Sequence, residues 1–367
     1  MTHNEPHNRR RARRAGAVVL TAMSAALIAA GCGSSGDDTT STTSTGVSTS
    51  AGMSPTASGG ITVGYSDPVA SNPAQQAVAR GQEEAAKEFG WDLVHLDANL
   101  SASKQVSDID TLISKKVDAI NSFTIDQGAA DAVYQRASQA GIPVIGQSSR
   151  SKYIQSSVWN QQNFDCSVAA KAAAYINART PGAKTLVIGG PPVGAITQYV
   201  NCFQDEAEKA GLDVLEKKDN TTDTASGGQP IAAALINKHP DVQAIWCYND
   251  PSCLGAGNAL KAAGKKIWKQ GESDSGVIVI GSNGSTDGIS AIKSGLMTVS
   301  YDINPDKVGA SVIALLAKHF EDGVPVKDLP KDVVVPTTEW DASNVGDYVD
   351  PIKRSIDTKT VDVDGQG

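Results

Sequence analysis

Short apolar runs alternate with longer stretches of helical character along most of the chain. In the first half, four apolar runs are predicted to form strands, at 61–65, 93–96, 117–123 and 142–145. A helix is predicted to open at Asn72-Pro73 and to end at Gly90, because asparagine caps helix starts, proline fits the first turn and glycine ends helices. Two more helices are predicted, at 103–114 and 127–140. This alternation predicts a parallel sheet with helices on both faces.

The second half repeats the alternation. Strands are predicted at 184–188, 211–215, 242–246 and 277–280, with a helix at 196–210. Three segments match the first half in the same order: GWDLV with GLDVL, KVDAI with DVQAI, and IPVIG with VIVIG. The chain is therefore predicted to contain two doubly wound units whose strand ends face each other across a cleft. A helix that begins at Asn304-Pro305 follows the second unit, and we expect it to cross back to the first.

The segment 241–256, DVQAIWCYNDPSCLGA, joins a buried strand to a helix. Asp250 is predicted to cap that helix, and Pro251 suits its first turn. Asn249 then stands at the carboxyl end of the strand, where open parallel sheets bind their ligands. This places Asn249 among the candidate ligand-binding residues, although asparagine in such a position often does no more than cap a helix.

Charge and motifs argue against several classes of function. The 367 residues carry a net charge of −8, which argues against a nucleic-acid partner because phosphate contacts need a concentrated basic surface. The sequence contains no G-x-S-x-G elbow, no GxxxxGK[ST] loop and no H-E-x-x-H motif. We therefore expect neither an enzyme nor a bound cofactor or metal.

The first 60 residues predict export. Five arginines between 9 and 14 precede an apolar segment, 15–30, which has the layout of a secretory signal peptide and ends at Gly31-Cys32. The segment before Cys32 resembles a bacterial lipobox, which implies lipidation of Cys32 and an anchor on the extracytoplasmic face of the membrane. A plain secretory signal and an uncleaved anchor are the alternatives, and the export route, general secretory or twin-arginine, stays open.

Cleavage after Gly31 would remove five of the 32 basic residues and one of the 40 acidic residues, which leaves 27 against 39 and a net charge of −12. The stretch 33–60 consists mainly of Ser, Thr, Gly and Asp, so it is predicted to be a disordered tether. A lipid and a tether would hold the rest of the chain close to a membrane.

Four cysteines follow the lipobox, and they allow three pairings. In an exported protein disulfides persist. Cys247 and Cys253 flank the strand end of the 241–256 junction, while Cys166 and Cys202 lie on helices that pack on one face of the second sheet. We predict these two pairs. A zinc site is the weaker alternative, because no CxxC pair or nearby histidine accompanies the cysteines.

The stretch 61–348 resembles the type I periplasmic binding proteins, the ribose-, galactose- and xylose-type receptors of ABC importers. The motifs that carry the resemblance are Asn72-Pro73, QAGIPVI at 139–145, HPDVQAI at 239–245, Asn249-Asp250 and GSNG at 281–284. The resemblance implies two doubly wound lobes joined by three hinge strands, near 158–163, 302–304 and 333–336. The implied divisions are a signal peptide at 1–31, the lipidated cysteine and tether at 32–60, an N-terminal lobe at 61–160 with 304–332, a C-terminal lobe at 161–303 with 333–355, and a tail at 356–367.

Only some of the pocket residues of ribose-type proteins are present at the corresponding positions of this sequence. Ala74 and Gln75 stand where the family has paired aromatic residues, and Ser148-Ser149 stand where it has Asp-Arg. Without the aromatic sandwich and the Asp-Arg fork, the resemblance implies a ligand other than a ribose-like ring. The candidate ligand-binding residues are mostly neutral hydrogen-bonding groups, with Trp159 and Tyr248 as aromatic surfaces that more often serve in packing: Ser66, Asn72, Gln75, Gln147, Ser148, Trp159, Thr197, Tyr248, Asn249, Asn283 and Asp302.

These residues predict an uncharged polyhydroxyl ligand, a small sugar or a sugar alcohol. The chain is thus expected to be a monomeric, lipid-anchored receptor that closes around its ligand and delivers it to an ABC permease. A sensory protein that reports to a membrane receptor is the alternative. A lactose-repressor-type regulator is disfavoured by the export signal, and a secreted hydrolase by the absence of a recognisable nucleophile.

Overall fold

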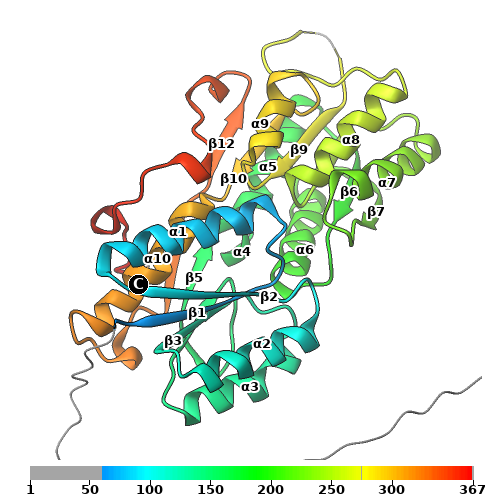
Figure 1. Cartoon of the computed structure of the whole chain (residues 1–367). Helices are drawn as coiled ribbons and strands as arrows, with labels where there is room; N and C mark the ends of the chain where they lie inside the picture. The colour runs from blue at the N-terminus through cyan, green and yellow to red at the C-terminus, as the bar shows by residue number, and fades with distance from the viewer. Residues whose placement is uncertain (1–59, 274, 366–367) are drawn as a thin grey trace, which may run out of the picture. The chain divides into compact units, whose positions relative to one another are not determined.

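The computed structural model describes residues 60–273 and 275–365, which form two six-stranded sheets with helices on both faces of each (Figure 1). This confirms the predicted α/β fold with two doubly wound units. The signal peptide, Cys32 and the tether up to residue 59 lie outside the described residues. We call the first sheet and the helices packed on it the first lobe, and the second sheet with its helices the second lobe.

The first sheet has the strand order β11-β5-β4-β3-β1-β2, and all of its strands run parallel. Its strands are β1 (Thr62–Asp67), β2 (Asp92–Asp97), β3 (Ala119–Ser122), β4 (Val144–Gln147), β5 (Ile154–Asn160) and β11 (Asp332–Val335). The helices α2 and α3 cover one face and α1 and α10 the other (Figure 1); their bounds are α1 (Pro73–Phe89), α2 (Ala102–Lys115), α3 (Gln127–Gln139) and α10 (Pro305–Phe320). Thus α10 returns to the first lobe, as the sequence predicted.

The second sheet has the order β12-β10-β9-β8-β6-β7, in which β12 alone runs antiparallel to its neighbour. Its strands are β6 (Lys184–Gly189), β7 (Asp213–Asp219), β8 (Ala244–Cys247), β9 (Ile278–Ser282), β10 (Val299–Asp302) and β12 (Thr338–Asp341). Its helices are α4 (Gln161–Phe164), α5 (Ser167–Arg179), α6 (Gly194–Lys209), α7 (Ala225–Lys238), α8 (Asp250–Ala262) and α9 (Thr286–Lys293).

The chain passes between the sheets at three places, after β5, between β10 and α10, and between β11 and β12. The three crossings are hydrogen-bonded to one another. Asn304 Nδ2 in the second crossing donates to Pro336 O at 2.8 Å, and Gln161 Oε1 in the first accepts from Thr337 N at 3.3 Å. They lie where the three hinge strands were expected. The expected lobe boundary at 332/333 falls inside β11, however, because that strand pairs with β5 in the first sheet.

Glycines allow α1 and α10 to pack in close contact. A Cβ at Gly81 would lie 2.1 Å from the Asp306 carbonyl oxygen, and one at Gly309 would lie 2.1 Å from the Val78 carbonyl oxygen. Only hydrogen fits at these two crossing points. The core of the second lobe depends instead on aromatic stacking, with the rings of Phe203 and Trp246 parallel and 4.2 Å apart.

Residues 342–365 form a segment, here called the strap, that leaves β12 and returns along α1 and α10 (Figure 1). It includes the short 3-10 helices η2 (Val345–Asp347), η3 (Pro351–Lys353) and η4 (Thr358–Thr360); another, η1 (Val326–Asp328), lies between α10 and β11. Tyr348 of the strap donates to Gly284 O of the second lobe, whereas Thr358 donates to Glu88 of α1. The strap therefore contacts both lobes beside the three crossings.

Arg354 of the strap binds the second crossing. Its guanidinium donates to Asp302 Oδ2 at 2.5 Å, and to Asp306 Oδ1 and Asn304 Oδ1 at 3.0 Å each. The side chains of Asp302 and Asp306 are almost fully buried, with exposed fractions of 0 % and 1 %. Arg354 thus neutralises two carboxylates that have no access to water.

The four cysteines form the two predicted disulfides. Cys166–Cys202 joins the start of α5 to α6, and Cys247–Cys253 joins the end of β8 to the first turns of α8. The zinc alternative is excluded for these cysteines because each sulfur is bonded to another sulfur.

We expect the removal of Cys166–Cys202, by replacing both residues with alanine, to lower the free energy of unfolding by about 2–4 kcal/mol. The bridge closes a sequence separation of 36 residues, and it restricts the unfolded chain over that length. Urea unfolding of the oxidised protein measures the loss. The matched variant without Cys247–Cys253, whose separation is 6 residues, is expected to lose less from this effect. An equal or smaller loss for the longer bridge would contradict the prediction.

Candidate functional site: the cleft between the two lobes

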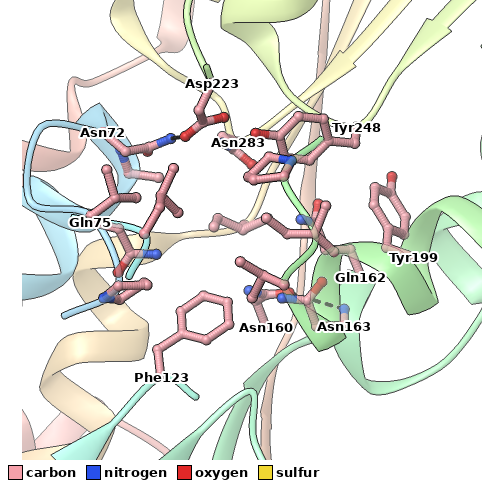
Figure 2. Close-up of a pocket in the computed structure, with 18 residues that line it drawn as sticks. Asn72, Gln75, Phe123, Asn160, Gln162, Asn163, Tyr199, Asp223, Tyr248 and Asn283 are labelled. Carbon is pink, nitrogen blue, oxygen red and sulfur yellow. Dashed lines mark hydrogen bonds between the residues drawn. The ribbon is translucent and has the colours of Figure 1, made fainter. Parts of the chain in front are cut away.

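A cavity of about 50 Å³ lies between the lobes and is lined by residues from both sheets' strand ends and from the first and second crossings (Figure 2). The polar residues that line it are Asn72, Gln75, Asn160, Gln162, Asn163, Tyr199, Asp223, Tyr248 and Asn283. Apolar surface comes from residues such as Phe123, Val193 and Ile196. Ligand sites are usually about 300–1,000 Å³. A sugar-sized molecule therefore requires the lobes to separate further than they do here.

Asp223 bridges the two lobes inside the cleft. It follows β7 in the second lobe, and its Oδ2 accepts from Asn72 Nδ2 of the first lobe at 2.6 Å (Figure 2). Its Oδ1 accepts from Asn249 Nδ2, also at 2.6 Å. Its backbone has a φ of 58°, a left-handed conformation that is uncommon outside glycine. Burial raises the pKa of Asp223 to about 6, while the hydrogen bonds from Asn72 and Asn249 oppose that shift.

Gln75 presents a donor to the cleft from the first lobe. Its Oε1 accepts from Tyr65 Oη at 2.8 Å and from Gln147 Nε2 at 3.3 Å. Behind it, Gln147 Oε1 accepts from Asn121 Nδ2 at 3.3 Å. Because these buried partners use the carbonyl oxygen of Gln75, its Nε2 amide is the group left for a ligand.

The first crossing supplies one donor and two acceptors. Asn160 caps α4, its Oδ1 accepting from Asn163 N at 3.0 Å, which leaves its Nδ2 to the cleft. In contrast, Gln162 Oε1 and Asn163 Oδ1 are buried without a hydrogen-bond partner, and so is the hydroxyl of Tyr248. Unpaired buried oxygens cost free energy, so a ligand that donates hydrogen bonds to them would be stabilised.

Local backbone features position Tyr248 and Asn283 in the second lobe. A Cβ at Gly190 would lie 2.5 Å from the Tyr248 ring, so glycine at this position makes room for that ring. Asn283 has a φ of 102°, and its N–H donates to Tyr301 O at 2.8 Å. The side-chain amide of Asn283 makes no hydrogen bond within the described residues.

Comparison with known proteins agrees with this geometry. The family model described as periplasmic binding protein domain matches residues 63–323. The chain belongs to this family. It is 28% identical over 252 residues to the ribose import binding protein RbsB of Bacillus subtilis (strain 168), with 68% of this chain and 78% of that protein covered. The family consists of binding proteins, and the chain is accordingly a binding protein and not an enzyme.

Solved structures share the fold. A Caulobacter myo-inositol binding protein superposes with a TM-score of 0.68 at 20% identity, over 78% of this chain and 94% of the other. A solute binding protein from Agrobacterium vitis with bound allitol also gives a TM-score of 0.68, at 21% identity, over 78% of this chain and 97% of the other. In binding proteins of this fold the lobes enclose a cleft. Among the described helices, none combines the length and apolar character that crossing a bilayer would require.

Four of the sequence-predicted residues line the cleft cavity: Asn72, Gln75, Tyr248 and Asn283. Three others are buried and do not line it. Asn249 holds Asp223, Gln147 holds Gln75, and Ser66 lies at the end of β1 with an unpartnered hydroxyl. Ser148 is buried next to Gln147, has a φ of 47°, and its hydroxyl is also unpartnered. Direct ligand binding by these residues stays a prediction.

Three predicted residues lie away from the cleft cavity. The Trp159 indole donates to Asp332 at 2.8 Å and stacks under Arg150, so it packs the edge of the first sheet. Thr197 is exposed on α6, where Ile196 and Tyr199 face the cleft instead. Asp302 binds Arg354 and accepts from the Trp340 indole, which leaves the carboxylate engaged with protein groups.

The predicted helix cap at Asp250 is wrong by one position. Asn249 is the cap of α8, and its Oδ1 accepts from Ser252 N at 3.0 Å. Asp250 turns inward and accepts from Ser285 N, Ser285 Oγ and Ser300 Oγ. Burial raises its pKa to about 7, although those hydrogen bonds lower it. Asp250 thus joins α8 to the start of α9 and to β10.

Sequence reasoning missed Asp223 and the amides of the first crossing. Asp223 stands in a polar loop, DNTTDT at 219–224, that shows no apolar pattern. One signal could have found it, since this loop follows a predicted strand and ligand residues gather at strand ends. Gln162 and Asn163 lie in a four-residue helix, which is too short for a periodic pattern to reveal.

Proposed function

We propose that the protein is an extracytoplasmic substrate-binding lipoprotein of an ABC importer, which binds an uncharged polyhydroxyl molecule, a sugar or sugar alcohol, by closing its lobes. The main support for this proposal is the set of side chains that line the cleft. One carboxylate and several amides line it, and none of the lining residues is basic. A ligand rich in hydroxyl groups can donate to Asp223, Gln162 and Asn163 and accept from Gln75 Nε2.

The lining also argues against two other ligand classes. An anion would be placed beside the Asp223 carboxylate without a cation to compensate, so acidic and phosphorylated ligands are disfavoured. A purely apolar ligand would leave the oxygens of Gln162 and Asn163 unpaired. Hydroxyl-bearing ligands avoid both costs.

The proposed transport role is supported by the relatives of the chain, and the proposed lipid anchor by the first residues of its sequence. The relatives include proteins named as ribose import binding proteins, and import by this family requires a permease in the membrane. The arginine-rich, apolar start of the chain and Cys32 support export and a lipid anchor. A ligand that contacts both lobes shifts the population towards the closed form. In the proposed mechanism the closed form delivers the ligand to the permease.

A thermal-shift screen of residues 60–367 tests the proposal. The ligands are uncharged sugars, sugar alcohols, amino acids, nucleosides and sugar phosphates. We expect the unfolding midpoint to rise with at least one sugar or sugar alcohol, since binding to the folded state stabilises it. A rise with amino acids or other charged ligands alone would overturn the polyol proposal.

Affinity for the strongest-binding polyol of that screen is expected to fall as the pH drops through about 6. Above the pKa of Asp223, which is about 6, its carboxylate is ionised and both oxygens accept hydrogen bonds. Below that pH one oxygen carries a proton and no longer accepts. Calorimetric titrations across this range measure the effect. The Asp223→Asn variant carries no titrating group at this position, so a fall of equal size in that variant would contradict the assignment.

A further inference from the structure

A second cavity, of about 260 Å³, lies beside the cleft. Its walls come from four segments: the first turns of α1, the loop that leads into α9 together with the first residues of α9, the start of α10 at Pro305, and residues 350–352 of the strap. Arg80 fixes the strap wall, since its guanidinium donates to Pro351 O at 3.2 Å and to Arg354 O at 3.1 Å. The second cavity is thus lined by both lobes and by a segment that contacts each of them.

The cleft and the second cavity share two wall residues, Ala74 and Asn283. Ala74 is 6 % exposed, and its methyl group is the smallest side chain that any L-residue other than glycine places there. Asn283 is 9 % exposed, yet its side-chain amide has no hydrogen-bond partner among the described residues. Because this amide bonds to no other group in the described part of the chain, it can donate to or accept from a bound molecule. The two cavities therefore meet at Ala74 of the first lobe and Asn283 of the second, and the Asn283 amide is available to a bound molecule.

The lining of the second cavity combines apolar and polar groups. Pro73, Ala77 and Ile352 supply apolar surface. Ser285 and Thr286 supply hydroxyl groups, Asp287 and Asp350 supply carboxylates, and no basic residue lines the cavity. Apolar patches suit the C–H faces of a sugar, whereas hydroxyl and carboxylate oxygens accept from its hydroxyl groups. Anions are disfavoured for the same reason as in the cleft.

We propose that the second cavity is a subsite for a second uncharged sugar unit, so that the ligand is a disaccharide or glycosyl-alditol with its first unit in the cleft. The linkage between the units passes Ala74 and Asn283, where the Asn283 amide binds it. This inference rests on the proposed function, because the first unit is the polyol of the cleft.

Calorimetric titration of residues 60–367 tests the subsite. Each two-unit ligand is compared with its components: maltose, cellobiose, lactitol and maltitol against glucose, galactose and sorbitol. We expect at least one two-unit ligand to bind ten-fold or more tightly than either of its components. Binding of single units without any gain for two-unit ligands would overturn the subsite and leave the proposed function standing. Binding of none of the carbohydrates would overturn both.

A bulky substitution in the second cavity distinguishes loss of the subsite from a non-specific effect of adding tryptophan to α1. Gln76 is exposed on α1 and lines the second cavity but not the cleft, so Gln76→Trp places an indole in the proposed subsite. Glu83, exposed two turns further along the same helix, lines neither cavity, and Glu83→Trp is the matched control. We expect Gln76→Trp to lower the ratio of two-unit to one-unit affinity at least ten-fold, and Glu83→Trp to change it less than two-fold. An unchanged ratio in a folded Gln76→Trp protein, checked by circular dichroism, would overturn the subsite.

Discussion

Replacing Asp223 by alanine is expected to weaken binding of the strongest-binding polyol by about 10- to 100-fold, which corresponds to roughly 1.4–2.8 kcal/mol. The substitution removes the acceptor that joins Asn72 of the first lobe to the second lobe, and it leaves the amide of Asn249 without its partner. The ligand thus loses a charged acceptor, and the lobes lose the Asn72–Asp223 hydrogen bond that joins them in this structure.

Asp219 offers a matched control for that measurement. Asp219 is the last residue of β7, the strand that precedes Asp223. It is exposed, pairs with Lys217 and does not line the cleft cavity. Exposed pairs of this kind contribute about 0–1 kcal/mol, so Asp219→Ala is expected to change affinity less than two-fold. Calorimetric dissociation constants that agree within three-fold between wild-type and Asp223→Ala protein would contradict the role given to Asp223.

Replacing Arg354 by methionine is expected to lower the free energy of unfolding by about 3–5 kcal/mol. Methionine keeps much of the apolar stem but leaves Asp302 and Asp306 buried without a cation. Burial already raises the pKa of the Asp306 carboxyl against the opposing effect of Arg354, so loss of the guanidinium makes ionised Asp306 less stable still. Urea unfolding monitored by tryptophan fluorescence measures the loss.

Arg136→Met is the control for Arg354→Met. Arg136 also forms a two-bond ion pair, with Asp110 at 2.8 and 2.9 Å, but both side chains are almost half exposed. Its loss is expected to cost less than about 1 kcal/mol. Adding Asp302→Asn to Arg354→Met is expected to recover part of the stability, because one buried charge then disappears. Equal losses for Arg354→Met and Arg136→Met would contradict the role given to the ion pairs of Arg354 with Asp302 and Asp306.

The sequence predicted the two sheets well because their central strands are continuous apolar runs. The strands at 184–189 and 244–247 pack in layers between helices, and such burial on both faces leaves a clear pattern. Prediction failed for α7, whose start, ASGGQP, has the composition of a turn. Tertiary packing forms this helix, since α7 and α8 approach so closely that a Cβ at Gly255 would lie 2.6 Å from Ala225 O.

The candidate site was predicted in two ways, from residues that directly follow a strand and from the family resemblance. Tyr248 and Asn283 directly follow strands, Asn72 and Gln75 came from the resemblance, and all four line the cleft. Asp302 was misplaced because Arg354, 52 residues further along the chain, occupies its carboxylate. The strap that carries Arg354 has no periodic apolar pattern, so its path along α1 could not be read from the residues alone.

The most direct test of the account is a crystal structure of the protein with the strongest-binding uncharged polyol. We expect the ligand between the lobes, with one hydroxyl group donating to the Asp223 carboxylate and another group within hydrogen-bonding distance of Gln75 Nε2. A polyol that binds outside the cleft, or that lies in the cleft without contacting Asp223, would contradict it.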